Sequence, residues 1–153
     1  VVLGCIDSRA PPELIFDQNI GDMFVARVAG NIASTDIIGS LEFATALAGA
    51  KLIVVLGHSE CGAVKGAIDD AKLGSLTGVL QQIRPSLAKL EYKGVPTSKD
   101  KALVQRVAEQ NAKDAAAQLT SRSDTMSGLA REGKLKIVYA MHDVATGKVA
   151  WLG

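Results

Sequence analysis

The sequence contains little of what several classes of protein require. Its 153 residues include two cysteines, too few for the disulfide framework of a small secreted domain. Lys and Arg total 17 against 16 Asp and Glu, so the net charge of +1 provides no broad basic surface for nucleic acid. The apolar run at residues 52–57 is much shorter than the about 20 residues that cross a bilayer. These shortages exclude a disulfide scaffold and a membrane span, and they predict that nucleic acid is not a partner.

Apolar residues, by contrast, are abundant enough for a folded core. The hydrophobic fraction is 48% and the charged fraction 22%, a balance typical of globular proteins. The length fits one domain, which we expect to occupy residues 1–153. The chain starts without Met inside an apolar run, so we expect a preceding segment to be missing. The cytoplasm is the default location. If the missing segment includes a leader, the alternative is a periplasmic or secreted protein.

Short apolar runs alternate along the chain with segments in which apolar residues recur at helical intervals. This order predicts an α/β fold with a mostly parallel central sheet flanked by helices, and a C-terminal edge strand that can run antiparallel. A helix after residue 34 would be capped by Thr35 or Asp36. The predicted strands are residues 1–4, 23–29, 51–57, 135–140 and 149–152, and the predicted helices are 35–48, 61–71, 77–90 and 101–119. Residues 91–100, with Gly94 and Pro96, predict a loop.

Three soft metal-ligand side chains follow the ends of predicted strands. In parallel sheets, ligands collect beyond the carboxyl ends of the strands, where Cys5 and His58 both fall, and Cys61 follows His58 by three residues. Thiolate and imidazole suit zinc, and a catalytic zinc usually keeps three protein ligands and one exchangeable position. We therefore predict one zinc ion per chain on these residues. A closed site of Cys and His alone would have to recruit His142. The two cysteines could instead form a disulfide or be buried as small hydrophobes.

Asp7 and Arg9 follow Cys5 closely. In an extended segment, residues two apart point the same way, so Cys5, Asp7 and Arg9 would share a face. Asp7 could then bind zinc as a fourth ligand in a closed state. Alternatively, it could pair with Arg9 and leave one zinc position open. An ordinary ion pair that fixes the loop is the third interpretation.

The segments CIDSR (residues 5–9) and GHSECGA (residues 57–63) resemble the two signatures of the β-class carbonic anhydrases. The segments at residues 21–31 and 40–44 reinforce the resemblance, which covers about residues 3–67 and 138–152. It implies zinc ligands at Cys5, His58 and Cys61, and a catalytic pair of Asp7 and Arg9. It also implies a homodimer or tetramer. Family members usually begin with helices that embrace a partner subunit, and we expect this chain to lack them.

The predicted function is zinc-dependent, reversible hydration of carbon dioxide to bicarbonate and a proton. In this hypothesis, Asp7, held by Arg9, orients a zinc-bound hydroxide for attack on carbon dioxide. Phe24, Val28, Ile32 and Gly62 are candidates for the substrate pocket, together with residues of a partner subunit. The alternatives are a zinc-dependent carbonyl sulfide or carbon disulfide hydrolase on the same site, a non-catalytic zinc- or anion-binding homologue, and a thiol redox protein.

Overall fold

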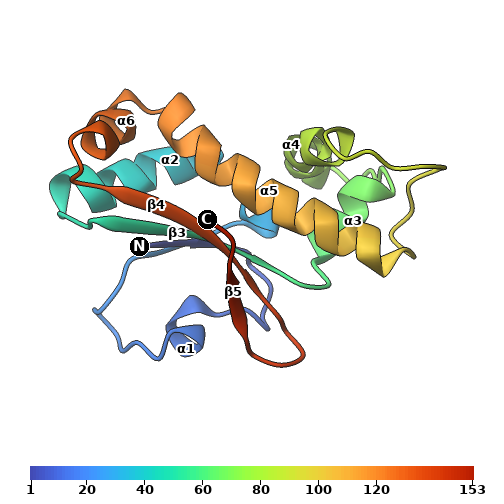
Figure 1. Ribbon diagram of the computed structural model, residues 1–153, viewed down its shortest axis with the longest axis horizontal. Coiled ribbons are helices and arrows are strands. Elements are labelled where there is room, and N and C mark those ends of the chain that lie inside the picture. Colours follow the sequence, from blue (N-terminus) through green and yellow to red (C-terminus); the bar gives the residue numbers. More distant parts are fainter.

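The structure is built on a five-stranded sheet with the order β2-β1-β3-β4-β5 (Figure 1). The computed structural model describes all 153 residues. Neighbouring strands run parallel except at one edge, where β5 is antiparallel to β4. The predicted fold class is therefore confirmed. The strands are β1 (Val2–Gly4), β2 (Val25–Arg27), β3 (Leu52–His58), β4 (Lys136–His142) and β5 (Val149–Trp151).

Six α-helices surround the sheet, and they cover its two faces unequally. Figure 1 shows α1 on one side of the sheet and the other five helices on the opposite side. None of these helices is long and apolar enough to cross a membrane. The helices are α1 (Pro12–Ile15), α2 (Thr35–Glu42), α3 (Gly62–Ile68), α4 (Leu76–Ala88), α5 (Lys101–Ser121) and α6 (Asp124–Arg131).

The hydrophobic core lies mainly on the face with five helices. Leu3, Ile53 and Val55 point to this face and join a buried cluster of 24 residues, whereas the cluster on the opposite face has four. Side chains alternate along a strand, so Val54 and its neighbour Val55 enter different clusters. The large cluster packs beneath α3, α4 and α5, and it supports the strand ends where Cys5 and His58 lie.

Two short helices were not predicted, and both have local signals. Pro12 opens α1, and the fixed φ of proline suits the first turn of a helix. Ser123 caps α6 by accepting a hydrogen bond from the amide of Met126. The predicted cap of α2 is wrong, because Ser34 is the N-cap and makes no side-chain cap hydrogen bond.

Several predicted boundaries are also corrected. The strand predicted at residues 23–29 is only β2, because the chain turns into a 3₁₀ segment at Ala29–Asn31, where Gly30 has a φ of 70°. The helix predicted to reach residue 48 changes at Phe43–Leu47 to a π-helical turn, in which the Thr45 hydroxyl donates to the Leu41 carbonyl. The strand predicted at residues 135–140 leaves His142 outside, whereas β4 extends to include it. It is buried at the end of β4, in register with His58.

The order of the strands creates a switch point between β1 and β3. The chain passes from β1 to the edge strand β2, then crosses back over β1 to β3 and continues to β4. Crossovers therefore leave the neighbouring strands β1 and β3 in opposite directions, which is where parallel sheets bind ligands. The carboxyl ends of β1 and β3 meet there, as predicted.

We expect Gly30→Ala to destabilise the protein by about 2–4 kcal/mol, because it combines a left-handed backbone with overpacking. An added Cβ would lie 2.5 Å from Ile83 Cδ1 and 3.3 Å from Ala63 Cβ. Gly128→Ala in α6 is the control, because nothing lies within 4 Å of its added Cβ and alanine favours a helix. Urea denaturation measures both variants. An unchanged unfolding free energy for Gly30→Ala would contradict this account of the turn.

Candidate metal centre

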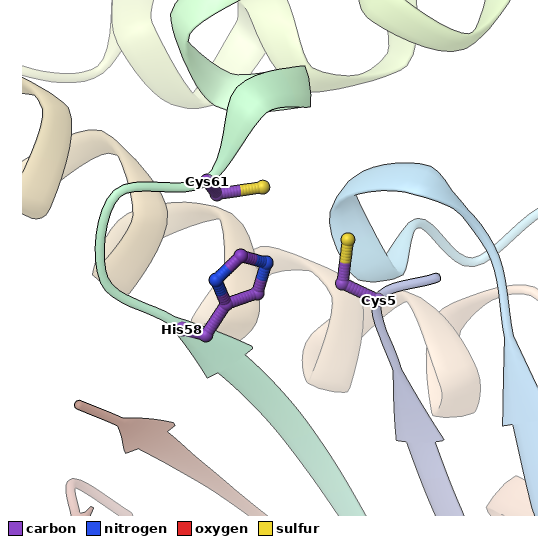
Figure 2. A group of neighbouring side chains, drawn as sticks. All are labelled: Cys5, His58 and Cys61. Atoms are coloured by element: carbon purple, nitrogen blue, oxygen red, sulfur yellow. The ribbon is translucent and has the colours of Figure 1, made fainter. Parts of the chain in front are cut away.

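Cys5, His58 and Cys61 converge at the carboxyl ends of β1 and β3. Cys5 directly follows β1, His58 is the last residue of β3, and Cys61 is the N-cap residue of α3. One potential ligand atom from each residue lies within 4.8 Å of the others. Figure 2 shows the imidazole and both thiols directed toward a common region. All three residues are buried, and both cysteines are free, so the disulfide alternative is not formed.

The hydrogen bonding of His58 fits a metal ligand. Its Nδ1 lies 2.9 Å from the carbonyl oxygen of Ser59. Since a carbonyl can only accept, Nδ1 carries the proton and Nε2 has a free lone pair. That Nε2 is buried and has no hydrogen-bond partner in the protein. A metal ion would satisfy it, and metal-bound histidines commonly donate their other ring N–H to a carbonyl in this way.

The two thiols differ in their readiness to ionise. Hydrogen bonding from Cys61 lowers the pKa of the Cys5 thiol against the opposing effect of burial, and the Gly30 amide adds to this. The Gly30 N–H lies 3.3 Å from Cys5 Sγ. Donation to Cys5, together with burial, raises the pKa of Cys61. The two sulfurs therefore compete for one proton. A divalent ion that replaced the shared proton would stabilise both sulfurs as ligands, as zinc does in sites of two Cys and one His.

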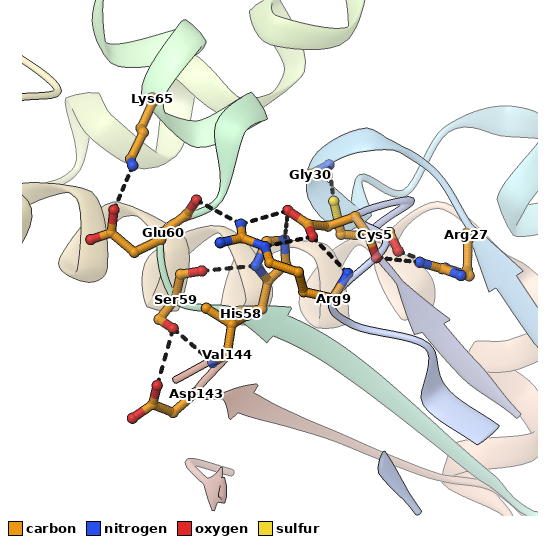
Figure 3. A network of polar contacts seen from close by, with 11 residues as sticks. Cys5, Arg9, Arg27, Gly30, His58, Ser59, Glu60, Lys65, Asp143 and Val144 are labelled. Atoms are coloured by element: carbon orange, nitrogen blue, oxygen red, sulfur yellow. Dashed lines mark hydrogen bonds and ion pairs between the residues drawn. The ribbon is translucent and has the colours of Figure 1, made fainter. Parts of the chain in front are cut away.

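Asp7 is paired with Arg9 in the structure. Arg9 Nε donates to Oδ1 at 2.9 Å, and Arg9 Nη2 donates to Oδ2 at 2.8 Å (Figure 3). This hydrogen bonding holds the pKa of Asp7 well below its usual range, so the group is a carboxylate. Its Oδ2 lies 3.8 Å from His58 Nε2. Of the two predicted orientations of Asp7, the structure contains the one turned to Arg9, beside the three donors.

The premise of an extended segment through Arg9 is wrong. Residues 7–10 form a turn in which the Ala10 amide donates to the Asp7 carbonyl. The Asp7 carboxylate also accepts from the backbone amide of Arg9 at 2.9 Å, a local bond typical of aspartate in turns. The pairing of Asp7 with Arg9 therefore comes from turn geometry.

Sequence reasoning gave no role to several residues that surround the three donors. Ser59 is tied to the end of β4, since its amide donates to His142 O and its hydroxyl accepts from the Val144 amide (Figure 3). Glu60 has a φ of 56°, a left-handed conformation that side chains other than glycine rarely adopt, and its carbonyl lies 3.4 Å from Arg9 Nη2. Arg27 donates to the backbone carbonyls of Cys5 and Asp7. The only sequence signal for Arg27 was a charge within an apolar run.

The four residues predicted for a substrate pocket are dispersed. Gly62 lines an apolar cavity of about 260 Å³ that also contacts Cys5 and Asp7. Phe24 lines a different hollow, with Val1 and Phe43, that includes none of the three donor residues. Val28 and Ile32 line neither cavity, and Ile32 is buried in the core.

Comparison with known proteins gives consistent relatives. A family model described as carbonic anhydrase matches residues 1–149. Carbonic anhydrase 2 of Mycobacterium tuberculosis is 35% identical over 153 residues, which cover 97% of this chain and 71% of the relative. The carbonic anhydrase of Mycolicibacterium smegmatis is 35% identical over 154 residues, covering 97% of this chain and 72% of the relative.

Solved structures agree with these sequence relatives. A structure from a study of two tetrameric β-carbonic anhydrases of Sordaria macrospora superposes with a TM-score of 0.84 and 29% identity, covering 99% of this chain and 79% of the other. A β-carbonic anhydrase of Aspergillus fumigatus gives a TM-score of 0.86 and 28% identity, covering 99% and 73% of the two chains. Because sequence and structure relatives agree over nearly the whole chain, this protein belongs to the β-class carbonic anhydrases.

Proposed function

We propose that this carbonic anhydrase hydrates carbon dioxide reversibly with one zinc ion per chain, held by Cys5, His58 and Cys61. The observation that carries the proposal is the buried group of three donor atoms within 4.8 Å of one another, which includes the unpartnered Nε2 of His58. When bound, zinc acts as a Lewis acid that lowers the pKa of water and so supplies a nucleophile near neutral pH.

Asp7 is the group proposed to orient that nucleophile. An ionised carboxylate only accepts hydrogen bonds, so a water beside Asp7 Oδ2 would direct a hydrogen to it and a lone pair away from it. Arg9 contacts both carboxylate oxygens and so fixes the plane of the carboxylate. Bidentate pairs of this kind restrict geometry as well as adding energy. Arg9 therefore acts through Asp7, keeping it an oriented acceptor.

The cavity beside Asp7 suits an uncharged substrate. It is lined mainly by apolar or small residues, including Ile6, Ala63, Leu76 and Leu80. Carbon dioxide can occupy such a surface without losing strong hydrogen bonds to water, whereas charged bicarbonate gains from leaving it. Carbonyl sulfide and carbon disulfide are also linear and apolar, so they enter the test as competing substrates.

We further propose that the enzyme is a homodimer or tetramer. Large apolar side chains are exposed around the β2 edge and the α1 and α2 segments: Leu14, Ile20, Phe24, Phe43 and Leu47. Of these, Phe24 and Phe43 lie together, with ring centroids 6.3 Å apart, and exposed apolar patches commonly mark contacts between proteins. The proteins of Sordaria macrospora noted above are tetrameric, which supports the same type of assembly here.

We expect His58→Ala to lose stoichiometric zinc and at least about 1,000-fold in hydration rate, because it removes one of three proposed metal ligands. His142→Gln is the matched control, since it changes the other histidine, whose ring is outside the donor group. Elemental analysis and stopped-flow hydration measure both variants. Loss of zinc from His142→Gln would show a four-ligand site and contradict the proposed ligand set.

Asp7→Asn should keep one zinc per chain and slow hydration by about 100- to 10,000-fold, the range associated with positioned acid–base groups. The amide can no longer accept on both oxygens and weakens the pair with Arg9. Asp124→Asn, an exposed change at the start of α6, is the control for the lost negative charge. Loss of bound zinc from Asp7→Asn would show that Asp7 is a metal ligand and would contradict the proposed role.

The hydration rate should rise from about pH 6 to pH 9, because a larger fraction of the water in the site is deprotonated at higher pH. Asp7 does not cause this rise. The pKa of Asp7 is lowered in the folded protein, so the group stays ionised over this pH range. The stability that ionised Asp7 contributes is complete above the ordinary carboxylate pKa and is lost only as the pH falls through the folded pKa. Stopped-flow assays on zinc-quantified protein, with a sulfide-release assay in parallel, test this. A flat profile would contradict the mechanism, and faster turnover of sulfur analogues would contradict the substrate.

A further inference from the structure

Arg27 is a charged residue in an otherwise apolar strand, close to the metal-binding residues. It is the last residue of β2 and stands in register with Gly4, the last residue of β1. Its side chain is half-buried and extends over the segment that follows β1 (Figure 3). Burying part of a guanidinium is costly unless its N–H groups find acceptors.

The acceptors of Arg27 are backbone carbonyls of two residues in the proposed active site. Arg27 Nε donates to Cys5 O at 2.7 Å, and Nη2 donates to Asp7 O at 2.5 Å. None of the ion pairs in the structure includes Arg27. Its hydrogen bonds therefore fix backbone positions and do not neutralise a carboxylate.

The two carbonyls belong to residues with different tasks. Cys5 carries a thiol of the donor group, and Asp7 carries the carboxylate that Arg9 holds. One rigid guanidinium spans both, so the distance between their backbones is set by its planar fork. The Asp7 carbonyl also accepts from Ala10 within the turn, whereas Arg27 is the hydrogen-bond donor found for the Cys5 carbonyl.

The segment after β2 holds Cys5 a second time. The Gly30 amide donates to Cys5 Sγ, and the Gly30 carbonyl accepts from Asn111 Nδ2 on α5 at 2.7 Å. The backbone of Cys5 is thus held by Arg27 and its sulfur by Gly30, three residues apart on the same segment. This arrangement restricts both where the thiol lies and how it points.

We propose that Arg27 is a positioning residue that clamps the Cys5 and Asp7 backbones, so that the thiolate meets the metal while the carboxylate stays on Arg9. The inference rests on the proposed zinc function and deepens it. The positioning depends on the two fixed donors of the guanidinium, because a single positive charge does not fix two carbonyls relative to each other.

The test compares Arg27→Met, Arg27→Lys and Arg131→Met with the wild-type holoenzyme. Met removes both donors but keeps an apolar stem, and Lys keeps the charge with one nitrogen in place of the fork. Arg131→Met is the matched control, because Arg131 is exposed at the end of α6 and takes part in none of the ion pairs or side-chain hydrogen bonds. Chelator competition measures zinc affinity, cobalt(II) absorption reports ligand geometry, and urea denaturation monitors the fold.

We expect Arg27→Met and Arg27→Lys to weaken zinc binding by about 10- to 100-fold, as loss of groups that orient metal ligands commonly does. Both should change the cobalt(II) spectrum of the folded protein, and Arg131→Met should leave it unchanged. If Arg27→Met does not fold, Arg27→Lys carries the test alone. A general loss of stability would lower the urea midpoint without altering the spectrum.

If both Arg27 variants bound zinc with wild-type affinity and gave wild-type cobalt(II) spectra, the proposed role of Arg27 would be overturned. A wild-type result for Arg27→Lys with losses only in Arg27→Met would also overturn it, since charge alone would then suffice. These results differ from failure of the proposed function. In that case the wild-type protein itself would not bind one zinc ion per chain, which would contradict both proposals.

Discussion

The parallel pairing of β1 with β3 is the constraint on which the site depends. Gly4 stands opposite Leu56, so the chain leaves β1 beside the point where β3 reaches His58. A slip of one residue would turn the buried side chains of β1 to the opposite face. The alternation of Leu3 and Val2 between the two cores opposes such a slip. Hydrophobic burial along the strands thereby determines which distant side chains meet.

Backbone groups provide much of the environment around the donors. The Ser59 carbonyl fixes the tautomer of His58, the Gly30 amide faces the sulfur of Cys5, and the Glu60 carbonyl contacts Arg9. Such groups have fixed partial charges and cannot titrate. They hold reactive side chains in place over a wide pH range, provided that the turns presenting them stay intact. Gly30, Asn31 and Glu60 adopt left-handed conformations at these turns, a strain that the surrounding structure must hold in place.

The sequence predicts those features that depend on residue type and local period. Apolar runs indicated the strands, and the sulfur and imidazole groups at their ends indicated the candidate metal ligands, whose donor atoms the structure brings together. It could not place Arg27 on the Cys5 carbonyl, because that contact depends on the pairing of β1 with β2. It missed α1 because a helix of four residues is too short to show a helical period. The separation of Phe24 from the donors likewise depends on the fold, because Phe24 precedes the amino end of β2 whereas the donors lie at the carboxyl ends of β1 and β3.

The unequal covering of the sheet has a consequence for local motion. The thinner face is closed by α1, a single turn of helix, and by residues such as Met23 and Val149. Segments with few buried contacts open at lower free energy than the rest of a domain. Amide hydrogens there would exchange with solvent soonest, while those of β3 stay protected. The face covered by α1 can thus open locally while the core on the opposite face keeps the reactive groups in place.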